Sequence, residues 1–149
     1  MTEPEWRTEV AERWNAHPAM VHMGATVTLW EDGSVHAVID PVQPYHRGGL
    51  GTQAANGAVI AGLFDLVIGL AGYQHTLERR AGVAQLTINY VRPVHGDRIE
   101  VIGRPVRVGR NLVFAEARLQ DERGSLCATC TGIVAVSGKH DAAAPEAVL

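Results

Sequence analysis

The chain has 149 residues, a formal net charge of −3 and a pI near 6.1. This length favours one domain with a real hydrophobic core, and the charge leaves no basic stripe for nucleic acid. No uninterrupted apolar run is long enough to span a membrane. The N-terminus, MTEPEWRTEVAERW, is charged and has no signal-peptide core, so we expect a cytoplasmic protein.

The N-terminal third predicts a short helix followed by a hairpin. Thr2 and Glu5 have the spacing of a capping box, and an apolar stripe at every fourth residue predicts a helix over about 4–15 that ends at His17-Pro18. Two strands are expected at Met23–Trp30 and Ser34–Ile39, joined by a turn with the Asp-Gly signal. We expect 40–51 to be a loop, because it is rich in proline and glycine.

From Thr52 to Gly72 the sequence is long and apolar, which fits the single central helix of a small domain. Between Ala58 and Ala71 the only polar side chain is Asp65. A buried carboxylate is destabilising by several kcal/mol unless it is paired or used, so Asp65 is either a functional acid or a satisfied structural residue.

The central helix has two different faces when residues are placed about 100° apart. Large side chains form one face, which we assign to the core: Val59, Ile60, Leu63, Val67 and Leu70. Small residues surround Asp65 on the other: Ala58, Ala61, Gly62, Gly69 and Gly72. Glycine inside a helix is destabilising by roughly 1 kcal/mol relative to alanine, so we expect another group to approach closely there.

The C-terminal half predicts four strands in a row. After a polar connection over 73–80, strands are expected at Val83–Val91, Arg98–Val108, Leu112–Leu119 and Ser125–Val136, with a bulge or an edge near Gly103 and Pro105. We expect a core over about 20–136 and a poorly ordered tail over 137–149. A strongly curved antiparallel sheet wrapped around one long helix, in the α+β class, satisfies this order.

Two residue types invite a metal or redox interpretation. Cys127 and Cys130 form a C-x-x-C pair, but a strand points these positions to opposite faces and no second pair completes a zinc site. We interpret them as buried structural thiols. The seven histidines are scattered without paired metal spacing, so no metal site is predicted.

Three segments together resemble the hotdog-fold acyl-CoA thioesterases: NGAVIAGLFDLVIGLAG, LTINYVRPVHGDRIEV and RNLVFAEARLQDERGSLCATCTGIVAV. The resemblance is closest to the PaaI-like (phenylacetate-pathway) branch of the 4-hydroxybenzoyl-CoA thioesterase superfamily, and it covers roughly 20–136. It implies a six-stranded hotdog sheet around one helix, a coenzyme A thioester as substrate and no separate cofactor.

The resemblance also implies site residues. The family opens its helix with His-Gly-Gly and carries an acid nine residues after the histidine, where this chain has Asn56-Gly57-Ala58 and Asp65. Asp65 is then the general base or nucleophile, and the Gly57 N–H polarises the thioester carbonyl. The chain departs from the family at Asn56 itself, at Leu50 (often Asn or Gln) and at Val83 (often Ser or Thr).

Those departures leave other residues to support the chemistry. Gln85, Thr87 or His46 are candidates to replace the missing polar groups, and Ala58, Gly62 and Gly69 are candidates to contact the substrate. Arg107, Arg110 and Asn111 lie at a predicted hairpin, where the resemblance implies contacts with coenzyme A phosphates and the alternative is a solvated turn.

The helix geometry predicts that the site is shared between subunits. If Asn56 caps the helix, the following N–H groups are free to hold an oxyanion at the positive end of the helix dipole. Asp65 lies nine residues later, which is about 13 Å along the helix and about 180° around it. One subunit's Gly57 must therefore serve another's Asp65, as in a homodimer or a dimer-of-dimers tetramer.

The sequence leaves three functions open. Acyl-CoA hydrolysis with a short, medium or aromatic acyl group is the first. The second is a hotdog protein that binds an acyl-CoA or lipid-like ligand without hydrolysing it, which the missing polar residues favour. An enoyl-CoA hydratase ranks last, because that reaction needs a histidine that this helix lacks.

Overall fold

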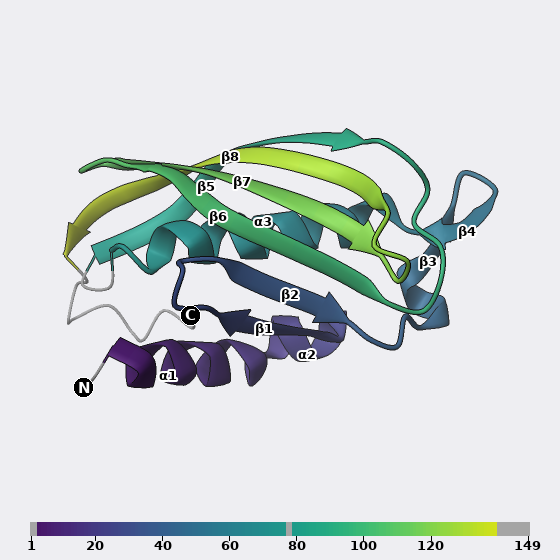
Figure 1. The fold of residues 1–149 in the computed structure, drawn as a ribbon, viewed down its shortest axis with the longest axis horizontal. Helices are drawn as coiled ribbons and strands as arrows, with labels where there is room; N and C mark the ends of the chain where they lie inside the picture. Colours follow the sequence, from purple (N-terminus) through teal and green to yellow (C-terminus); the bar gives the residue numbers. More distant parts are fainter. Residues whose placement is uncertain (1–2, 77–78, 140–149) are drawn as a thin grey trace.

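The computed structural model describes residues 3–76 and 79–139, and one antiparallel sheet dominates it (Figure 1). The sheet has six strands in the order β1-β2-β6-β7-β8-β5, and it curls around the long helix α3. In chain order the elements are α1 (Glu3–Asn15), α2 (Pro18–Met23), β1 (Ala25–Leu29), β2 (Val35–Ile39), the 3-10 helix η1 (Pro44–His46), β3 (Arg47–Gly49), β4 (Thr52–Ala55), α3 (Gly57–Tyr73), β5 (Arg79–Tyr90), β6 (Ile99–Val108), β7 (Leu112–Asp121) and β8 (Leu126–Lys139).

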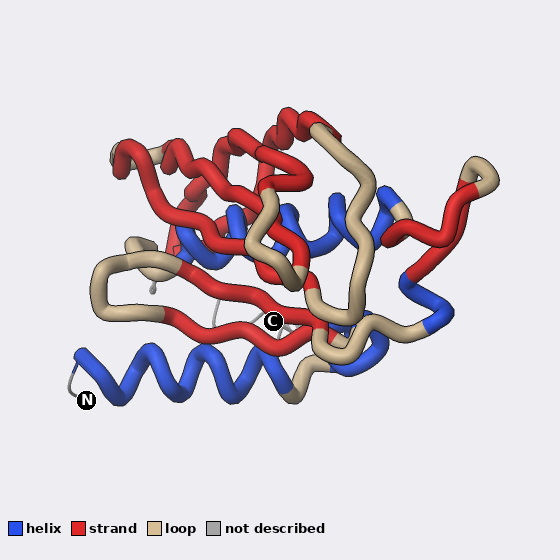
Figure 2. Tube along the Cα trace, turned by 45° about the vertical axis from the view of Figure 1, so that its right-hand side comes forward, coloured by secondary structure: helices blue, strands red, loops and turns tan. Residues whose placement is uncertain are grey.

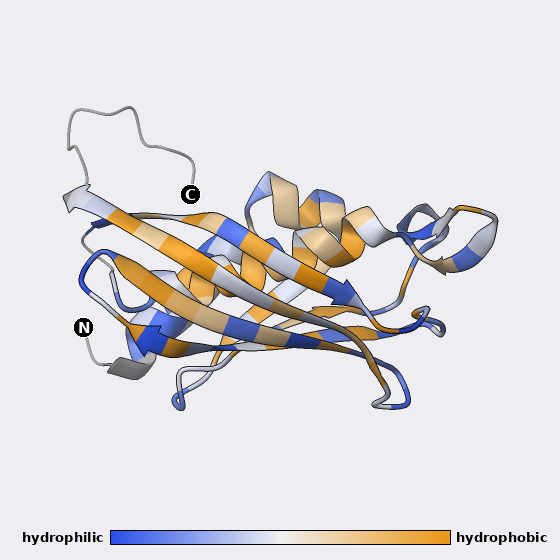
Figure 3. Ribbon diagram, turned by 90° about the horizontal axis from the view of Figure 1, so that it is seen from above, coloured by the Kyte–Doolittle hydropathy of each residue, from blue (hydrophilic) through white to orange (hydrophobic). Residues whose placement is uncertain are grey.

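The core lies between α3 and the concave face of the sheet. Successive strand residues point to opposite faces, so every second residue of β2 and β7 is buried, beginning with Val35 and Val113. Figure 3 shows this alternation as successive orange and blue segments along the long strands. The bulky face of α3 packs against these residues and includes the fully buried Leu63, Phe64 and Val67.

Two strand glycines allow α3 to pack directly against the backbone of the sheet. A Cβ placed on Gly103 would clash with a methyl of Val67, and one on Gly132 would lie 2.7 Å from Ile68. Any side chain at either position would push the helix away from the sheet and open voids in the core.

The two edges of the sheet differ. At the β1 edge, α1 lies alongside the strand (Figure 2), and the Asn15 amide both donates to the Val27 carbonyl and accepts from the Val27 N–H. At the other edge, β5 pairs only with β8 within the described residues. One edge is therefore covered by the chain itself, and the other presents a 12-residue strand with an unpaired side.

The N-terminal predictions of a helix and of a following strand are confirmed, but the short helix between them was not predicted. Thr2, one member of the predicted capping box, lies outside the described residues. The chain forms a second helix, α2, where the first strand was expected to begin, and β1 starts only at Ala25. The His17 side chain caps the start of α2, and Gly24 ends it in the left-handed conformation at φ 71°. The predicted Asp-Gly turn between β1 and β2 is confirmed, with Gly33 at φ 83°.

The segment before α3 is also more ordered than expected. The predicted loop over 40–51 contains η1 and β3, and Thr52–Ala55 forms β4 rather than the first turn of the helix. The β3–β4 hairpin projects from the body of the molecule (Figure 2). The helix begins at Gly57 because the Asn56 side chain accepts the Ala58 N–H at 2.8 Å and caps it.

The last four strands match the prediction, with longer ends. β5 begins at Arg79 within the expected polar connection, and β8 continues to Lys139, so that 137–139 belong to a strand rather than to a tail. The rest of the predicted tail, 140–149, lies outside the described residues. The predicted irregularity in β6 is confirmed as a register shift between Pro105 and Arg107. The architecture is the hotdog fold, and no helix within 3–76 and 79–139 is long and apolar enough to cross a bilayer.

Candidate active site

A groove of about 380 Å³ runs along the side of α3 that carries Gly62, Asp65 and Gly69. Its floor is α3, one wall comes from α1 and α2, and the other comes from the first half of β5. Its lining is mainly apolar, and Asp65 is the only carboxylate in it. The prediction that glycines flank Asp65 on one helix face is confirmed for Gly62 and Gly69. The face is not bare, because Leu66, Leu70 and Tyr73 of α3 also line the groove.

The Asp65 carboxylate has no hydrogen-bond or ion-pair partner among the described residues, and it is exposed in the single chain. Desolvation by the groove walls nevertheless raises its pKa above the ordinary value of 3.8. Solvent reaches the carboxylate from the open side, while the walls remove part of its hydration. An unpaired carboxylate with a raised pKa has the properties of a general base or nucleophile.

Two glycines beside Asp65 are the points where the groove walls approach the helix. A Cβ on Gly62 would lie 3.0 Å from the Met23 methyl, and one on Gly69 would lie 3.4 Å from a methyl of Val83. The close approach predicted for these glycines is therefore present. Gly72, which was placed on the same face, instead packs under Val134, whose Cβ would lie 2.7 Å from an added Cβ.

The N-terminus of α3 carries the predicted oxyanion donor. Asn56 is fixed on both sides, because its side-chain oxygen accepts from Ala58 and its amide donates to the Gly48 carbonyl at 2.8 Å. Gly57 and Ala58 are exposed at the first turn, and within the described residues the Gly57 N–H has no acceptor. The Tyr90 hydroxyl donates to the Gly57 carbonyl at 3.3 Å, which places an aromatic ring beside this end of the helix.

Gly57 and Asp65 are too far apart to act on one bond within a single chain. Both belong to the regular helix α3, and eight residues of helix span about 12 Å. A thioester carbon must lie within about 3–3.5 Å of the attacking atom, with the oxyanion donor at hydrogen-bond distance. Gly57 and Asp65 of the same chain therefore cannot both act on one thioester group.

Gln85 and Thr87 lie on β5 but outside the groove. Both side chains are exposed, and the Gln85 amide donates to the Thr87 hydroxyl at 3.3 Å. A register shift between Val83 and Gln85 explains this, because an extra residue in the strand turns the following side chains to the other face. Val83 itself remains in the groove wall, where it presents methyl groups.

Leu50, the other departure from the family pattern, lies at the tip of the β3–β4 hairpin. It is fully exposed and has a positive φ of 50°, which is unusual for a residue other than glycine. In the single chain it therefore makes no contribution to the groove.

His46 is a buried structural histidine in this chain. Only 2% of its surface is exposed. Its Nδ1 accepts the Gln43 N–H at 2.8 Å, and its Nε2 lies 2.6 Å from the Met23 carbonyl. Both ring nitrogens are engaged, so His46 has no free group to offer a substrate.

The predicted coenzyme A contacts lie together at the β6–β7 hairpin. Arg107, Arg110 and Asn111 are all exposed there. Arg79, which the sequence prediction missed, donates to the Arg110 carbonyl at 2.6 Å. Because Arg79 is only two residues from Ala81 in the groove wall, the hairpin and the end of the groove are linked by about 7 Å of strand. The long sequence separation of Arg79 from the hairpin hid this link.

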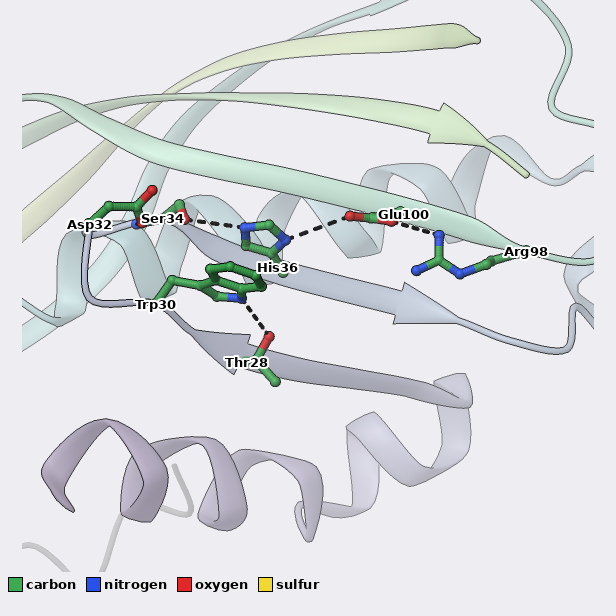
Figure 4. Close-up of polar contacts among 7 residues, drawn as sticks. All are labelled: Thr28, Trp30, Asp32, Ser34, His36, Arg98 and Glu100. Atoms are coloured by element: carbon green, nitrogen blue, oxygen red, sulfur yellow. Dashed lines mark hydrogen bonds and ion pairs between the residues drawn. The ribbon is translucent and has the colours of Figure 1, made fainter. Parts of the chain in front are cut away.

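A second polar cluster lies on the outer face of the sheet, away from α3 (Figure 4). Its central residue, His36, has Ser34 Oγ 3.2 Å from Nε2 and Glu100 3.6 Å from Nδ1. This composition invites comparison with a Ser-His-acid triad. However, Ser34 is 3% exposed, and its hydroxyl donates to Asp32 at 2.5 Å, so it has no path to a substrate.

The cluster instead joins the β1–β2 hairpin to β6. Trp30 stacks on His36 with 4.4 Å between ring centroids, and Arg98 donates to Glu100 at 2.6 Å. Burial alone would raise the pKa of Glu100, but the Arg98 hydrogen bond and charge, with a smaller effect of His36, lower it below the ordinary 4.5. A nearby hollow of about 390 Å³ on the same face is lined by residues such as Arg104 and Glu116, which lie opposite each other in the strand register.

The two cysteines are buried free thiols, as predicted. Burial, together with a smaller effect of the Asp65 charge, raises the pKa of Cys130 to about 11, so this thiol stays neutral. Among the described residues there is no group of three histidine, cysteine, aspartate or glutamate side chains that could hold a metal ion.

Solved structures with the same architecture include proteins from three bacteria. A Shewanella oneidensis protein related to the thioesterase superfamily is 23% identical, with a TM-score of 0.78 over 90% of this chain and 97% of that chain. A thioesterase from Haemophilus influenzae is 18% identical, with a TM-score of 0.77 over 92% and 94% of the two chains. The PaaI protein from the phenylacetic acid degradation operon of Escherichia coli is 17% identical, with a TM-score of 0.75 over 90% and 94%.

At these identities the structural likeness shows the fold. No curated protein matches the sequence. The family model described as the thioesterase superfamily matches residues 52–128, which is more than half of the chain and includes α3 with Asp65. The chain therefore belongs to the thioesterase superfamily.

Proposed function

We propose that this thioester hydrolase cleaves an acyl-CoA with Asp65 of one subunit and the N–H of the partner subunit's Gly57. The observation that carries the proposal is the unpaired Asp65 carboxylate in an otherwise apolar groove. An apolar groove suits the acyl part of a thioester, and a lone partly desolvated carboxylate suits proton transfer beside it. The substrate class is a short, medium or aromatic acyl-CoA.

The reaction needs only the thioester and water. As a general base, Asp65 takes a proton from water while the oxygen attacks the carbonyl carbon, and the N–H of Gly57 stabilises the oxyanion. Collapse of this intermediate breaks the C–S bond, and the departing thiolate takes the proton back from Asp65. As a nucleophile, Asp65 would itself attack the carbonyl carbon, and the C–S bond would break to expel the coenzyme A thiolate and leave an anhydride. Water would then hydrolyse the anhydride, which releases the acyl group as the free acid, regenerates the Asp65 carboxylate and supplies the proton that the thiolate takes up. Both routes use the same two groups.

The proposed site is completed by a second copy of the chain. About 12 Å of helix separates Gly57 from Asp65, so a two-fold arrangement must bring each helix start to the partner's helix middle. The unpaired side of β5 supports this arrangement, because β5 also forms one wall of the groove. A homodimer joined at this edge would bury the open strand and the groove mouth together. A dimer of such dimers is the larger assembly we consider.

The coenzyme A part of the substrate is proposed to reach the β6–β7 hairpin. Arg107 and Arg110 are exposed cations there, and Arg79 ties the hairpin to the groove wall. Phosphate groups are bound well by arginine. Replacing Arg107 and Arg110 by glutamine should therefore raise KM for acyl-CoA several-fold and leave kcat nearly unchanged.

The test is thiol release from short, medium and aromatic acyl-CoA substrates by the wild-type protein and by Asp65→Asn. Release that depends on Asp65, with fold and oligomeric mass unchanged, supports the proposal. If the wild-type protein forms the oligomer and binds acyl-CoA but releases no thiol, the proposal is contradicted.

A further inference from the structure

The Met23 side chain packs over α3 at the floor of the groove, and hydrogen bonds fix its backbone. It is the last residue of α2, and Gly24 closes that helix by donating its N–H to the Met20 and Val21 carbonyls. The Met23 side chain is half-buried in the groove wall and reaches over Gly62, where a Cβ would lie 3.0 Å from its methyl. Gly62 lies one helical turn before Asp65, so the thioether lies beside the reacting group.

His46 fixes the position of Met23 through the backbone. Because its Nδ1 accepts the Gln43 N–H, the ring proton must sit on Nε2, which donates to the Met23 carbonyl at 2.6 Å. Gly24 lies against the same ring, where an added Cβ would be 3.3 Å from it. The end of α2 therefore has little freedom to move relative to η1.

The same residue also holds the start of α3. The His46 carbonyl accepts the Asn56 N–H at 2.8 Å, and Asn56 is the cap that presents the Gly57 N–H. His46 thus links the groove wall beside Asp65 with the oxyanion end of the helix in one subunit.

A fixed backbone with a flexible side chain is suited to select ligands by size. Methionine has an unbranched, adaptable side chain that fills irregular apolar spaces. With its backbone pinned, Met23 can only rearrange its thioether, and the groove beyond Gly62 opens or closes with that movement. The bare glycine beneath it leaves room for either an acyl group or the thioether.

We propose that Met23 is the specificity-determining residue that limits the length of the acyl group, and that His46 is the residue that positions it. This inference rests on the proposed acyl-CoA hydrolysis and adds to it the selection of the acyl group. It predicts that the wild type prefers acyl groups that end at the Met23 side chain. Longer groups must displace the thioether.

The experiment measures kcat/KM for a series of saturated acyl-CoA substrates of increasing length. Met23→Ala should raise the ratio of long-chain to short-chain kcat/KM by about 10-fold or more, since one or two methylene groups in an apolar pocket change such ratios by this amount. Gly62→Ala should lower the ratio, because the new methyl competes with Met23 for space. Val21→Ala is the matched control, because Val21 lies on the same helix but is 67% exposed and outside the groove.

Two substitutions separate the roles of the two ring nitrogens of His46. His46→Gln can place its amide nitrogen near the former Nε2 and keep the bond to the Met23 carbonyl. His46→Asn can keep the acceptor for Gln43 but loses that donor. We expect His46→Gln to retain the wild-type chain-length ratio and His46→Asn to shift it toward that of Met23→Ala. A purely structural histidine would lower the melting temperature and kcat for all substrates equally.

Each outcome has one meaning. If the wild type hydrolyses acyl-CoA and Met23→Ala leaves the length ratio within two-fold of wild type, this inference is wrong and the proposed function stands. If the wild type hydrolyses no acyl-CoA, the proposed function fails and this inference fails with it. Equal ratios for His46→Gln and His46→Asn in folded proteins would remove His46 from the inference.

Discussion

Asp65 and Glu100 are two carboxylates in opposite surroundings. Asp65 lies in an apolar groove without a partner among the described residues, and desolvation raises its pKa. Glu100 lies on the outer face of the sheet between Arg98 and His36, and these partners lower its pKa despite burial (Figure 4). The first carboxylate is destabilised in its charged form, and the second is stabilised in it.

This contrast separates a reactive group from a structural one. A carboxylate whose hydrogen bonds are already formed within the protein is little stabilised by a substrate. A carboxylate without such bonds can form them with the substrate or with water. Catalytic groups are often placed where they lower stability, and the fold compensates elsewhere. The cluster around Glu100 contains more of the residue types that are common in catalytic sites. Of the two carboxylates, however, Asp65 is the one that a substrate can reach and whose oxygens have no hydrogen-bond partner among the described residues.

Removal of the Asp65 charge should have the largest effect on activity. Asp65→Asn should lower kcat/KM by at least about 100-fold, because loss of a general base or nucleophile has effects of this size. The melting temperature should stay the same or rise, because a desolvated charge is removed. Steady-state kinetics and thermal unfolding check both parts. Turnover within ten-fold of wild type would show that Asp65 is not the reacting group.

Removal of the Glu100 charge should have the opposite pattern. Glu100→Gln weakens the contacts with Arg98 and His36, and we expect the free energy of unfolding to fall by about 1–2 kcal/mol. kcat/KM should remain within two-fold of wild type. Urea denaturation gives the stability, and the exposed Glu9→Gln is the control, because its ion pair with Arg13 should contribute no more than about 0.5 kcal/mol. A large loss of activity without unfolding would overturn the structural role of Glu100.

Asn56 is expected to affect stability and activity together. Asn56→Ala removes the cap of α3 and the bond to Gly48, which should lower the free energy of unfolding by about 1 kcal/mol. kcat/KM should fall as well, because the cap fixes the turn that carries the Gly57 N–H. Asn56→Ser retains a cap acceptor and should recover most of the stability. If activity is unchanged in the folded alanine variant, the helix start does not hold the oxyanion.

The smallest expected effect is on the pH dependence of the free energy of unfolding, which should have opposite signs for the two carboxylates. The folded pKa of Asp65 is raised, so its contribution to stability is full below the unfolded value near 3.8 and is lost as the pH rises through the folded pKa. The folded pKa of Glu100 is lowered, so its contribution is present above 4.5 and is lost as the pH falls through the folded pKa.

Unfolding free energies of wild type, Asp65→Asn and Glu100→Gln between about pH 3 and pH 7 would reveal the two trends. Relative to wild type, Asp65→Asn should gain stability as the pH rises, and Glu100→Gln should lose it. Hydrolysis should also decline in acid with an apparent pKa above 3.8. Parallel curves for the two variants would show that the two carboxylates do not differ in this way.

Periodicity made most of the fold predictable. The 3.6-residue repeat separated the bulky face of α3 from the Asp65 face, and strict alternation identified strands such as β7. The short elements were missed because they carry no period. α2 has six residues and β3 has three, and their existence depends on caps and on glycines with positive φ rather than on hydrophobic pattern.

The site was predictable where one helix determines it and not where distant segments meet. Asp65, Gly62 and Gly69 are evident from the helical repeat alone. Gly72 shares their sequence pattern, but β8 packs on it, which no local signal reveals. Met23 belongs to the groove only because α2 folds against α3, and His46 could be distinguished from a catalytic histidine only by its backbone partners.

Because the β5 edge is uncovered in the single chain, we expect the activity to depend on protein concentration. The opposite edge is closed within the chain by Asn15, so order at β1 is independent of how much protein is present. An edge closed by a second copy obeys mass action, and its stability rises with chain concentration. Under the proposed shared site, specific activity would then fall on dilution even though each chain keeps its own acid, helix and groove. Hydrolysis would therefore require dimer formation, whereas the packing of α1 on β1 would be complete in each single chain.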